Sequence, residues 1–323
     1  MNGLIKFNKE LFFLPFDLYG RYRIIAELIQ TIRTRDKLRI LDVGGNVEVL
    51  NYSVFKKFLP NDHVIVLDKS RNNYKDYIRA DALNLPFGKE EFDLVVSADV
   101  LEHIPRDKRE RFLEEQLRVA KQGVVLTAPF FSKETVEAER VAAAFYKSLS
   151  NKDHRWLSEH KKFVLPDVSW FESFLMQHGL HFKKILHNYI PYWNLMICAH
   201  FYTEFNANAV KGLNQINKFY NSFVFPYDNQ NPACKYVYLI TKEKLPEKMG
   251  GIRSSRPDKN FLPQIQQMIF ELIGRSNKSL IDKNRILAVD SLILKQILNS
   301  RKWKIISFIN NIRIKIPILK NFN

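Results

Sequence analysis

Cysteines and long hydrophobic runs are scarce in this sequence. Only two of the 323 residues are cysteine, Cys198 and Cys234, and their spacing fits no metal-binding pair. We therefore expect no disulfide framework and a reducing compartment. No uninterrupted apolar run reaches the roughly 18 residues that span a bilayer. The apolar cluster at 11–16 is interrupted by Pro15 and is too short for a signal peptide, so a cytoplasmic protein is expected.

Acidic residues are also few relative to basic ones. There are 34 Asp and Glu against 50 Lys and Arg, which gives a formal charge of +16. Such an excess favours an anionic partner, which could be a nucleic acid, an anionic membrane surface or a phosphorylated substrate. The apolar fraction of 46% is ordinary for a globular protein with a large core.

Strand-length apolar runs alternate with helical patterns over the first 130 residues. The apolar runs occur at 38–43, 63–68, 77–81, 92–99 and 123–130. Helical spacing occurs at 17–34 and again after Pro105, in a segment that we expect to end at Gly123 with a left-handed C-cap. Nearly all-apolar strands that alternate with helices predict a parallel sheet covered on both faces.

The predicted fold is a doubly wound α/β domain with a mostly parallel, seven-stranded sheet, a helical insertion and a helical C-terminal appendage. The predicted domain extends over 1–243 and is followed by a linker at 244–260 and a basic amphipathic appendage at 261–323. Within the domain we expect a core at 35–130, substrate-side insertions at 131–233 and a closing strand at 234–241. Within the insertion, helices are predicted at 134–149 and 167–178, separated by a polar loop.

The turn after the first predicted strand has two adjacent glycines, in ILDVGGNVEVL at 40–50, but lacks the third glycine of a dinucleotide-binding loop. Glycine lets a ligand approach the backbone closely, and open parallel sheets bind ligands at the carboxyl ends of their strands. Glu48 in this turn would repel a pyrophosphate. A cationic cofactor without phosphate, such as S-adenosylmethionine (SAM), would suit the acidic residues at four predicted strand ends: Asp42, Asp68, Asp81 and Asp99.

These segments together resemble the class I SAM-dependent methyltransferases, in particular their small-molecule branch. ILDVGGN is similar to the glycine-rich motif, VIVLD to the ribose-binding motif, RADALNLPF to the adenine-side motif, and FDLVVSADVLEHIP and GVVLTAPF to the fourth and fifth strands. The resemblance implies a Rossmann-like fold, methyl transfer and SAM as the cofactor. The cofactor-binding residues that it implies are Asp42, Gly44, Gly45, Asn46, Asp68, Lys69, Asp81, Ala82, Ser97, Ala98 and Asp99.

Histidines near the strand ends are candidates for the catalytic base. A hydroxyl acceptor needs alignment with the sulfonium and a base for its proton. His103 directly follows the fourth strand, and the insertion segment HRWLSEHKK supplies His154, Glu159 and His160. The alternative is a polar lid whose histidines bond only to the backbone.

A metal site is a further hypothesis for the DVLEH turn. Asp99, Glu102 and His103 stand at i, i+3 and i+4, so a helical turn would place them on one face. Carboxylate and imidazole suit a divalent metal, and the pattern resembles the metal-binding turn of ubiquinone-pathway O-methyltransferases and of RNA 3′-terminal methyltransferases. In metal-independent relatives similar turns only orient the loop, and the sequence analysis therefore predicts no metal.

The acceptor is expected to be a sugar hydroxyl or a phosphate on a glycan. Parts of the insertion, including AERVAAAFYKSL and HRWLSEHKKFVLPD, resemble methyltransferases of surface-polysaccharide and glycan assembly loci. The alternatives are an RNA methyltransferase, which the charge favours, and a non-catalytic assembly module. Nucleic acid is the less favoured partner, because SADV replaces the N/D-P-P-Y/F turn of enzymes that methylate base amines.

The last 29 residues are strongly basic, with seven Lys or Arg and no acidic residue in 295–323. Apolar residues at helical spacing form a stripe between these cations, a pattern typical of helices that lie on anionic membranes. A peripheral position on the inner face of the membrane is one interpretation. Packing on the protein itself or on a second subunit in a homo-oligomer is the other.

Overall fold

A computed structural model describes residues 9–45, 47, 53–246 and 260–277. Two compact units divide the chain, 1–272 and 273–323, and the sheet belongs to the first. Asn46, Glu48, most of the predicted linker and the predicted membrane-binding segment at 295–323 lie outside the described residues.

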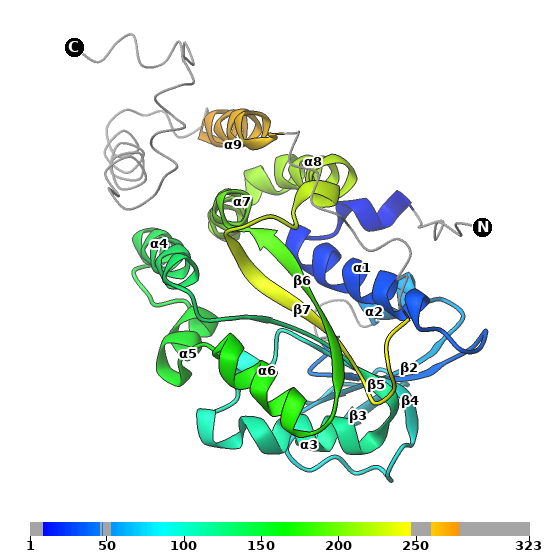
Figure 1. The fold of residues 1–323 in the computed structure, drawn as a ribbon. Coiled ribbons are helices and arrows are strands. Elements are labelled where there is room, and N and C mark those ends of the chain that lie inside the picture. Colours follow the sequence, from blue (N-terminus) through cyan, green and yellow to red (C-terminus); the bar gives the residue numbers. More distant parts are fainter. Residues whose placement is uncertain (1–8, 46, 48–52, 247–259, 278–323) are drawn as a thin grey trace. The chain divides into compact units, whose positions relative to one another are not determined.

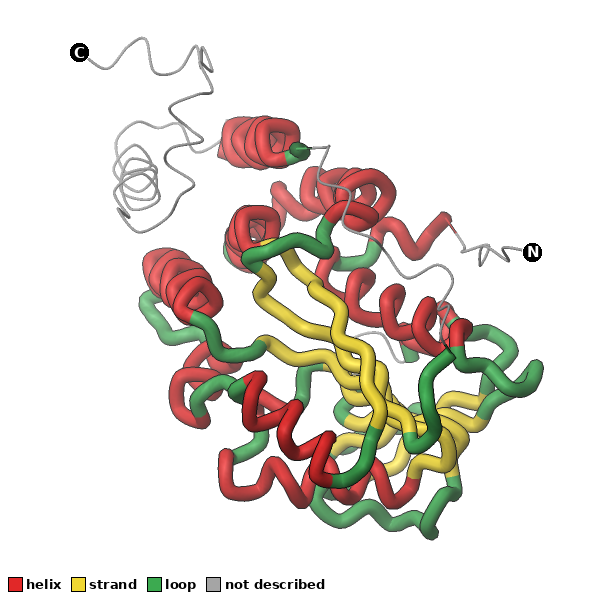
Figure 2. Tube along the Cα trace, in the orientation of Figure 1, coloured by secondary structure: helices red, strands yellow, loops and turns green. Residues whose placement is uncertain are grey.

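A seven-stranded sheet forms the centre of the first unit (Figures 1 and 2), as the sequence predicted. Its strands are β1 (Arg39–Val43), β2 (His63–Asp68), β3 (Tyr77–Arg79), β4 (Phe92–Ala98), β5 (Ala120–Pro129), β6 (His181–Tyr189) and β7 (Ala233–Thr241). Their order is β3-β2-β1-β4-β5-β7-β6. The pairs among β1 to β5 are parallel, and β7 runs antiparallel to both β5 and β6.

Helices precede, connect and follow these strands. They are α1 (Phe16–Thr31), α2 (Val54–Phe58), α3 (Arg109–Val119), α4 (Lys133–Ser150), α5 (Arg155–Phe163), α6 (Val168–Gln177), α7 (Ile190–Glu204), α8 (Val210–Phe219) and α9 (Leu262–Asn277). Helices α1 and α2 lie against one face, and α3 and α6 against the other (Figure 1).

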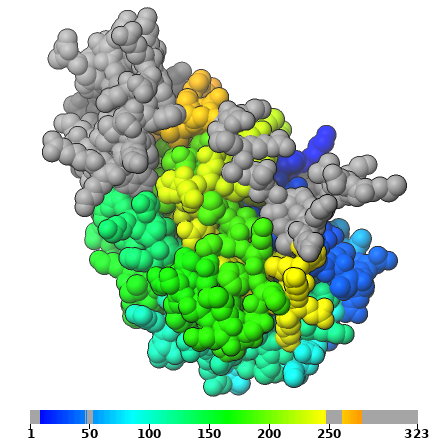
Figure 3. Space-filling view, viewed as in Figure 1, coloured from blue at the N-terminus to red at the C-terminus, as the bar shows by residue number. Residues whose placement is uncertain are grey.

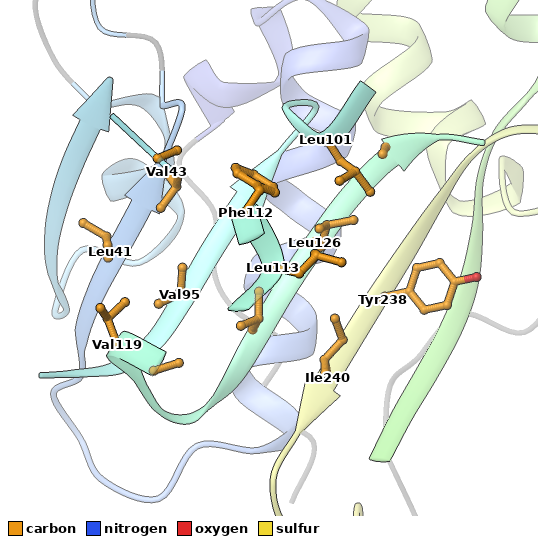
Figure 4. Packing of buried hydrophobic residues seen from close by; sticks show 14 of the residues in the cluster. Leu41, Val43, Val95, Leu101, Phe112, Leu113, Val119, Leu126, Tyr238 and Ile240 are labelled. Carbon is orange, nitrogen blue, oxygen red and sulfur yellow. The ribbon is translucent and has the colours of Figure 1, made fainter. Parts of the chain in front are cut away.

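The apolar residues of the strands explain this two-sided covering. All seven residues of β4 are buried, as expected for a central parallel strand. On the face covered by α3 and α6, Phe112 and Leu113 pack with Leu41, Val95 and Leu126 from three strands (Figure 4). Burying such side chains contributes about 1.5–3 kcal/mol each, so this layer is a principal source of stability.

Side-chain caps fix where the insertion helices begin. Ser132 accepts a hydrogen bond from the Thr135 amide at 2.9 Å at the start of α4, and Asp167 accepts one from the Trp170 amide at 3.0 Å at the start of α6. At its other end α4 stops at Asn151, which adopts the left-handed conformation (φ 57°). Such caps contribute about 1 kcal/mol each. They confirm the predicted helices at 134–149 and 167–178.

Two predictions about secondary structure were wrong. The helix after Pro105 ends at Val119, and Gly123 lies inside β5 rather than in a C-cap. A Cβ at Gly123 would lie 2.0 Å from the carbonyl oxygen of Ile240, so close pairing with β7 is what requires glycine there. The polar loop predicted between α4 and α6 instead contains α5.

Strand β6 was not located from the sequence. Its sequence, HFKKILHNY, contains Lys183 and Lys184, which are exposed, and its first half reads as polar. It lies at one edge of the sheet, and among the described strands it pairs with β7 alone. Half-exposed edge strands carry a weak apolar signal, which is why the pattern was missed.

The strand order reverses at β1, whose neighbours are β2 on one side and β4 on the other. In open α/β sheets the crevice outside the carboxyl ends of such strands is the usual ligand site. Within the described residues, no helix is both long enough and apolar enough to cross a membrane.

Candidate functional site

The turn after β1 brings backbone and carboxylate close together. Gly44 has φ +76°, and a Cβ there would lie 2.3 Å from Cγ2 of Val100. A Cβ at Gly45 would lie 2.4 Å from Oδ2 of Asp42. A side chain would therefore not fit at either position, and at Gly44 the left-handed backbone conformation also favours glycine. The first two positions of the predicted cofactor loop are thus tightly packed, whereas Asn46 lies outside the described residues.

Asp42 is buried beneath this turn with one oxygen partnered and one not. Its Oδ2 accepts a hydrogen bond from the Tyr22 hydroxyl at 3.2 Å, and its Oδ1 has no partner in the described part of the chain. Burial raises the pKa of Asp42 to about 7, and the Tyr22 hydrogen bond opposes that rise only partly. Near neutral pH the carboxyl can therefore either accept or donate a hydrogen bond.

The carboxyl ends of β2 and β3 form an open hollow of about 380 Å³, lined by Lys69, Arg79, Ala80 and Asp81. Lys69 Nζ lies 3.6 Å from Asp81 Oδ1. Ala82, the next predicted site residue, is buried. At the end of β2, Asp68 Oδ1 accepts hydrogen bonds from the Ser70 amide (2.9 Å) and the Ser70 hydroxyl (2.6 Å).

The end of β4 supplies the remaining predicted cofactor residues. Ser97 and Ala98 are buried, and the Ser97 hydroxyl has no partner among the described residues. Asp99 follows with φ +58° and accepts hydrogen bonds from the Thr127 hydroxyl at 2.7 Å and from Lys235 Nζ at 2.5 Å. The four aspartates predicted at strand ends thus lie along one edge of the sheet, but in unlike surroundings.

Asp99 belongs to a charged network of two acids and two bases: Asp17, Arg21, Asp99 and Lys235. Lys235 Nζ lies 2.6 Å from Asp17 Oδ1, and Arg21 contacts both carboxylates, at 2.8 and 3.2 Å. Burial opposes ionisation of the two carboxyls, but Lys235 and Arg21 outweigh it and lower the pKa of both. Asp99 is thus already neutralised by the protein.

The charged network was not predicted from the sequence. Its signal was present in β7, because Lys235 is a lysine within an otherwise apolar strand and is only 8% exposed at its side chain. A buried lysine requires an acidic partner. The i, i+4 spacing of Asp17 and Arg21 in α1 was a second clue.

A second polar cluster joins the turn after β4 to the insertion. It contains Glu102, His103, Glu139, Glu159 and His160, here called the His–Glu cluster. Glu102 and His103 lie on a 3₁₀ turn (Leu101–His103) that packs against α5, which carries Glu159 and His160. His103 Nδ1 lies 2.9 Å from Glu159 Oε2, and His160 Nδ1 lies 2.8 Å from Glu139 Oε1.

The centre of the His–Glu cluster is buried and short of partners. The side chains of Glu102 and His160 are 2% and 10% exposed, and His160 Nε2 lies 4.0 Å from Glu102 Oε1. That separation is too long for a hydrogen bond. In the described part of the chain neither His160 Nε2 nor Glu102 Oε2 has a partner. One ligand atom each from Glu102, His103 and His160 lies within 4.8 Å of the others.

The cluster shifts the pKa values of its members in different directions. Burial and then the charge of Asp99 raise the pKa of Glu102 to about 8. Burial and then His160 lower the pKa of His103 to about 4, against the effect of Glu159. For His160, burial favours the neutral ring, but the hydrogen bond to Glu139 outweighs it and raises the pKa. Perturbed groups gathered in this way are typical of functional sites.

Three of the four predicted catalytic residues, His103, Glu159 and His160, thus lie in the cluster. The fourth, His154, precedes α5 and accepts a hydrogen bond from the Leu157 amide at 3.4 Å, while its ring packs on Tyr146 and Phe201. Glu139 had no predicted role, although it lies in the predicted helix at 134–149.

Residues 48–128 match the model of a family described as "Methyltransferase domain". No curated protein matches the sequence. Similar solved structures include YcgJ from Bacillus subtilis, with 13% identity, TM-score 0.39, and 68% of this chain and 99% of that chain covered.

Two further solved structures contain the demethylated cofactor. Plantazolicin methyltransferase BpumL, in complex with a pentazolic desmethylPZN analogue and S-adenosylhomocysteine, shares 16% identity over 71% of this chain and 86% of that chain, with TM-score 0.43. A Haemonchus contortus phosphoethanolamine N-methyltransferase, also in complex with S-adenosylhomocysteine, shares 17% identity over 68% of this chain and 51% of that chain, with TM-score 0.40.

The family match begins at residue 48, after β1 and the two glycines that follow it, and ends in β5. It therefore includes the carboxyl ends of β2, β3 and β4, where ligands bind in open α/β sheets. The glycine turn and the strand-end aspartates lie at that edge in the order that the resemblance implied. Residues 48–128 are therefore a methyltransferase domain, in a chain whose glycine turn and strand-end aspartates resemble those of class I SAM-dependent methyltransferases, and the cofactor is S-adenosylmethionine.

Proposed function

We propose that this protein transfers a methyl group from SAM to a hydroxyl group, or to a phosphate oxygen, on a saccharide. The observation that carries the proposal is the His–Glu cluster directly after β4, where the acceptor would face the cofactor edge of the sheet. The acceptor oxygen attacks the methyl carbon, the carbon–sulfur bond breaks, and S-adenosylhomocysteine leaves. The hydroxyl proton passes to a group of the cluster.

The proposed cofactor contacts follow the predicted residues. The carboxylate of Asp68 accepts hydrogen bonds from the ribose hydroxyls. Asp81, which lines the hollow with Lys69, and the neighbouring Ala82 lie beside the adenine. Gly44 and Gly45, with Ser97 and Ala98, form the wall toward the methionine moiety, beside Asp42, whose Oδ1 has no partner among the described residues.

The surface beside the His–Glu cluster supports a saccharide that carries negative charge. Trp156 is 47% exposed, and its ring centroid lies 5.1 Å from that of His103. An exposed indole can stack on the apolar face of a sugar ring. Arg155, Lys161 and Lys162 on the same helix are exposed and would attract an anionic group. Helices α4 to α6 contribute much of the face shown in Figure 3, in teal and green.

Cofactor binding is the first test of this proposal. Calorimetry should show SAM binding to the wild type and about tenfold to hundredfold weaker binding to Asp68→Ala, because hydrogen bonds to a charged group contribute about 1.5–3 kcal/mol in total. The exposed Asp107→Ala is the matched control and should bind like the wild type. No binding by the wild type, or equal affinity in Asp68→Ala, would contradict the proposal.

Acceptor class is the second test. The enzyme is incubated with methyl-labelled SAM and matched neutral and phosphorylated saccharides, and mass spectrometry locates the label. Label on oxygen, with a higher rate for the phosphorylated saccharides, is expected. Label that enters only RNA or an amine in parallel reactions would reject the saccharide and support another methyltransferase activity.

A further inference from the structure

We propose that Glu102, His103 and His160 bind a divalent first-row transition-metal ion. One ligand atom from each lies within 4.8 Å of the others, from elements far apart in the sequence. Ligands of a metal bound at about 2.1 Å stand roughly 3–4 Å apart, so small side-chain rotations would bring these atoms into position. The sequence pattern indicated Asp99, Glu102 and His103 as the candidate ligands. In the structure Asp99 is paired with Lys235, and His160 takes its place beside Glu102.

The orientation of the two imidazoles supports a metal. His103 and His160 each place Nδ1 against a carboxylate, that of Glu159 at 2.9 Å and that of Glu139 at 2.8 Å. This arrangement fixes the ring and leaves Nε2 available for a ligand. Metal-binding histidines almost always have such a carboxylate or carbonyl behind them, which orients the ring and raises its basicity.

The missing hydrogen bonds at the centre are a second, independent observation. Glu102 Oε2 and His160 Nε2 are buried without partners in the described part of the chain. Buried polar atoms are nearly always satisfied, because an unpaired one costs about 1–3 kcal/mol. Glu102 Oε1 and His160 Nε2 face each other at 4.0 Å without bonding. A cation between them would satisfy both residues at once.

The donor set indicates the kind of ion. Two imidazoles and one carboxylate suit zinc, iron, cobalt or manganese better than calcium or magnesium, which prefer oxygen ligands. Three protein ligands leave coordination positions open, as in catalytic rather than structural sites. We infer that an open position receives the acceptor oxygen.

This role rests on the proposed methyl transfer. A hydroxyl group that is bound to a divalent cation has a lowered pKa. Its proton can then pass to a carboxylate of the cluster, the oxygen forms its bond to the methyl carbon, and S-adenosylhomocysteine leaves. The metal would thus both position and acidify the acceptor.

The test is a titration of the chelator-treated full chain with Co²⁺, followed by visible absorption. The wild type should develop a saturable band at one equivalent. Glu102→Gln and His160→Asn should bind Co²⁺ at least tenfold more weakly, while His181→Asn, at an exposed position on β6, should match the wild type. No saturable band in the wild type, or unchanged affinity in both cluster variants, would overturn the metal site.

Calorimetry with SAM on the same samples separates this inference from the proposed function and reports whether each variant is folded. If SAM binds and Co²⁺ does not, only the metal site is rejected. If Co²⁺ binds and SAM does not, the methyl-transfer role is rejected while the metal site stands. Competition of Zn²⁺ with Co²⁺ in the wild type provides a readout that needs no variant, and failure of Zn²⁺ to displace Co²⁺ would count against a shared site.

Discussion

The charged network and the His–Glu cluster lie near the same edge of the sheet, yet they differ in how completely their polar atoms are paired. In the charged network two carboxylates meet two cations at 2.5–3.2 Å. In the His–Glu cluster Glu102 and His160 each keep a buried atom without a partner among the described residues. A network whose polar atoms are paired can hold structural elements together by itself. Buried polar atoms without partners instead indicate a position where a ligand would bind.

The position of the charged network agrees with a structural role. Its members come from α1, the end of β4 and β7, so it joins the first helix to two strands of the sheet. The His–Glu cluster joins the turn after β4 to α4 and α5, which belong to the substrate-side insertion. The two regions are adjacent in sequence at Asp99 and Glu102, and burial alone would not tell them apart.

The largest expected effect is on the charged network. Lys235→Met removes one of its two cations and leaves Arg21 as the remaining cation for Asp17 and Asp99, so the free energy of unfolding should fall by about 3–5 kcal/mol. Urea denaturation measures the change. The control is Lys184→Met on β6, whose surface ion pair with Glu172 (2.7 Å) should contribute less than about 1 kcal/mol. Equal losses in both variants would contradict a structural role for the network.

A second expected effect concerns pH and Glu102. Its pKa rises from 4.5 to about 8, so between these values the folded chain keeps a proton that the unfolded chain releases. The stability contributed by this group is present below pH 4.5 and is lost as pH rises to about 8.

Glu102→Gln should remove that loss. In a chelator, the stability of the wild type relative to Glu102→Gln should fall across this window by on the order of a few kcal/mol. Urea denaturation at several pH values measures it. The exposed variant Glu114→Gln should follow the wild type. A pH-independent difference between the wild type and Glu102→Gln would show that the carboxyl titrates normally.

An intermediate case is Asp42, which has a partner for Oδ2 but none for Oδ1 among the described residues. Tyr22→Phe removes its hydrogen bond of 3.2 Å and should lower the free energy of unfolding by about 1 kcal/mol. Tyr146→Phe is the control, because the Tyr146 hydroxyl has no hydrogen bond within the described part of the chain and its ring contacts are kept. A loss equally large in Tyr146→Phe would mean that the Tyr22 hydroxyl has no special role.

The smallest effect on stability is expected at the exposed edge of the His–Glu cluster. Trp156→Ala should change the free energy of unfolding by less than about 0.5 kcal/mol. The KM for the saccharide acceptor should nevertheless rise about tenfold, equivalent to about 1.4 kcal/mol. Steady-state kinetics measures it, with Phe223→Ala, at a residue that is 60% exposed, as control. An unchanged KM would remove Trp156 from the acceptor site.

Local patterns were sufficient to predict most of the fold. Six strands were located because their residues are mostly apolar, helix α1 because of the spacing of its apolar residues, and helices α4 and α6 from their sequences. Strand β6 was missed because edge strands are half polar, and Gly123 was misassigned because a glycine after a helix usually ends it. Glycine is required at position 123 because the backbone of Ile240 lies close to it, and Ile240 belongs to a strand more than 100 residues away.

For the candidate site, the sequence by itself determined which residues stand at the strand ends, because parallel strands align their carboxyl ends. It therefore placed Asp42, Asp68, Asp81 and Asp99 along one edge of the sheet and indicated SAM. Only the tertiary structure decided how these groups are partnered. It paired Asp99 with Lys235, and it brought His160 and Glu139 to Glu102. The reason is physical: partnership between buried charges depends on distances of a few ångströms, which only the packing of distant segments sets.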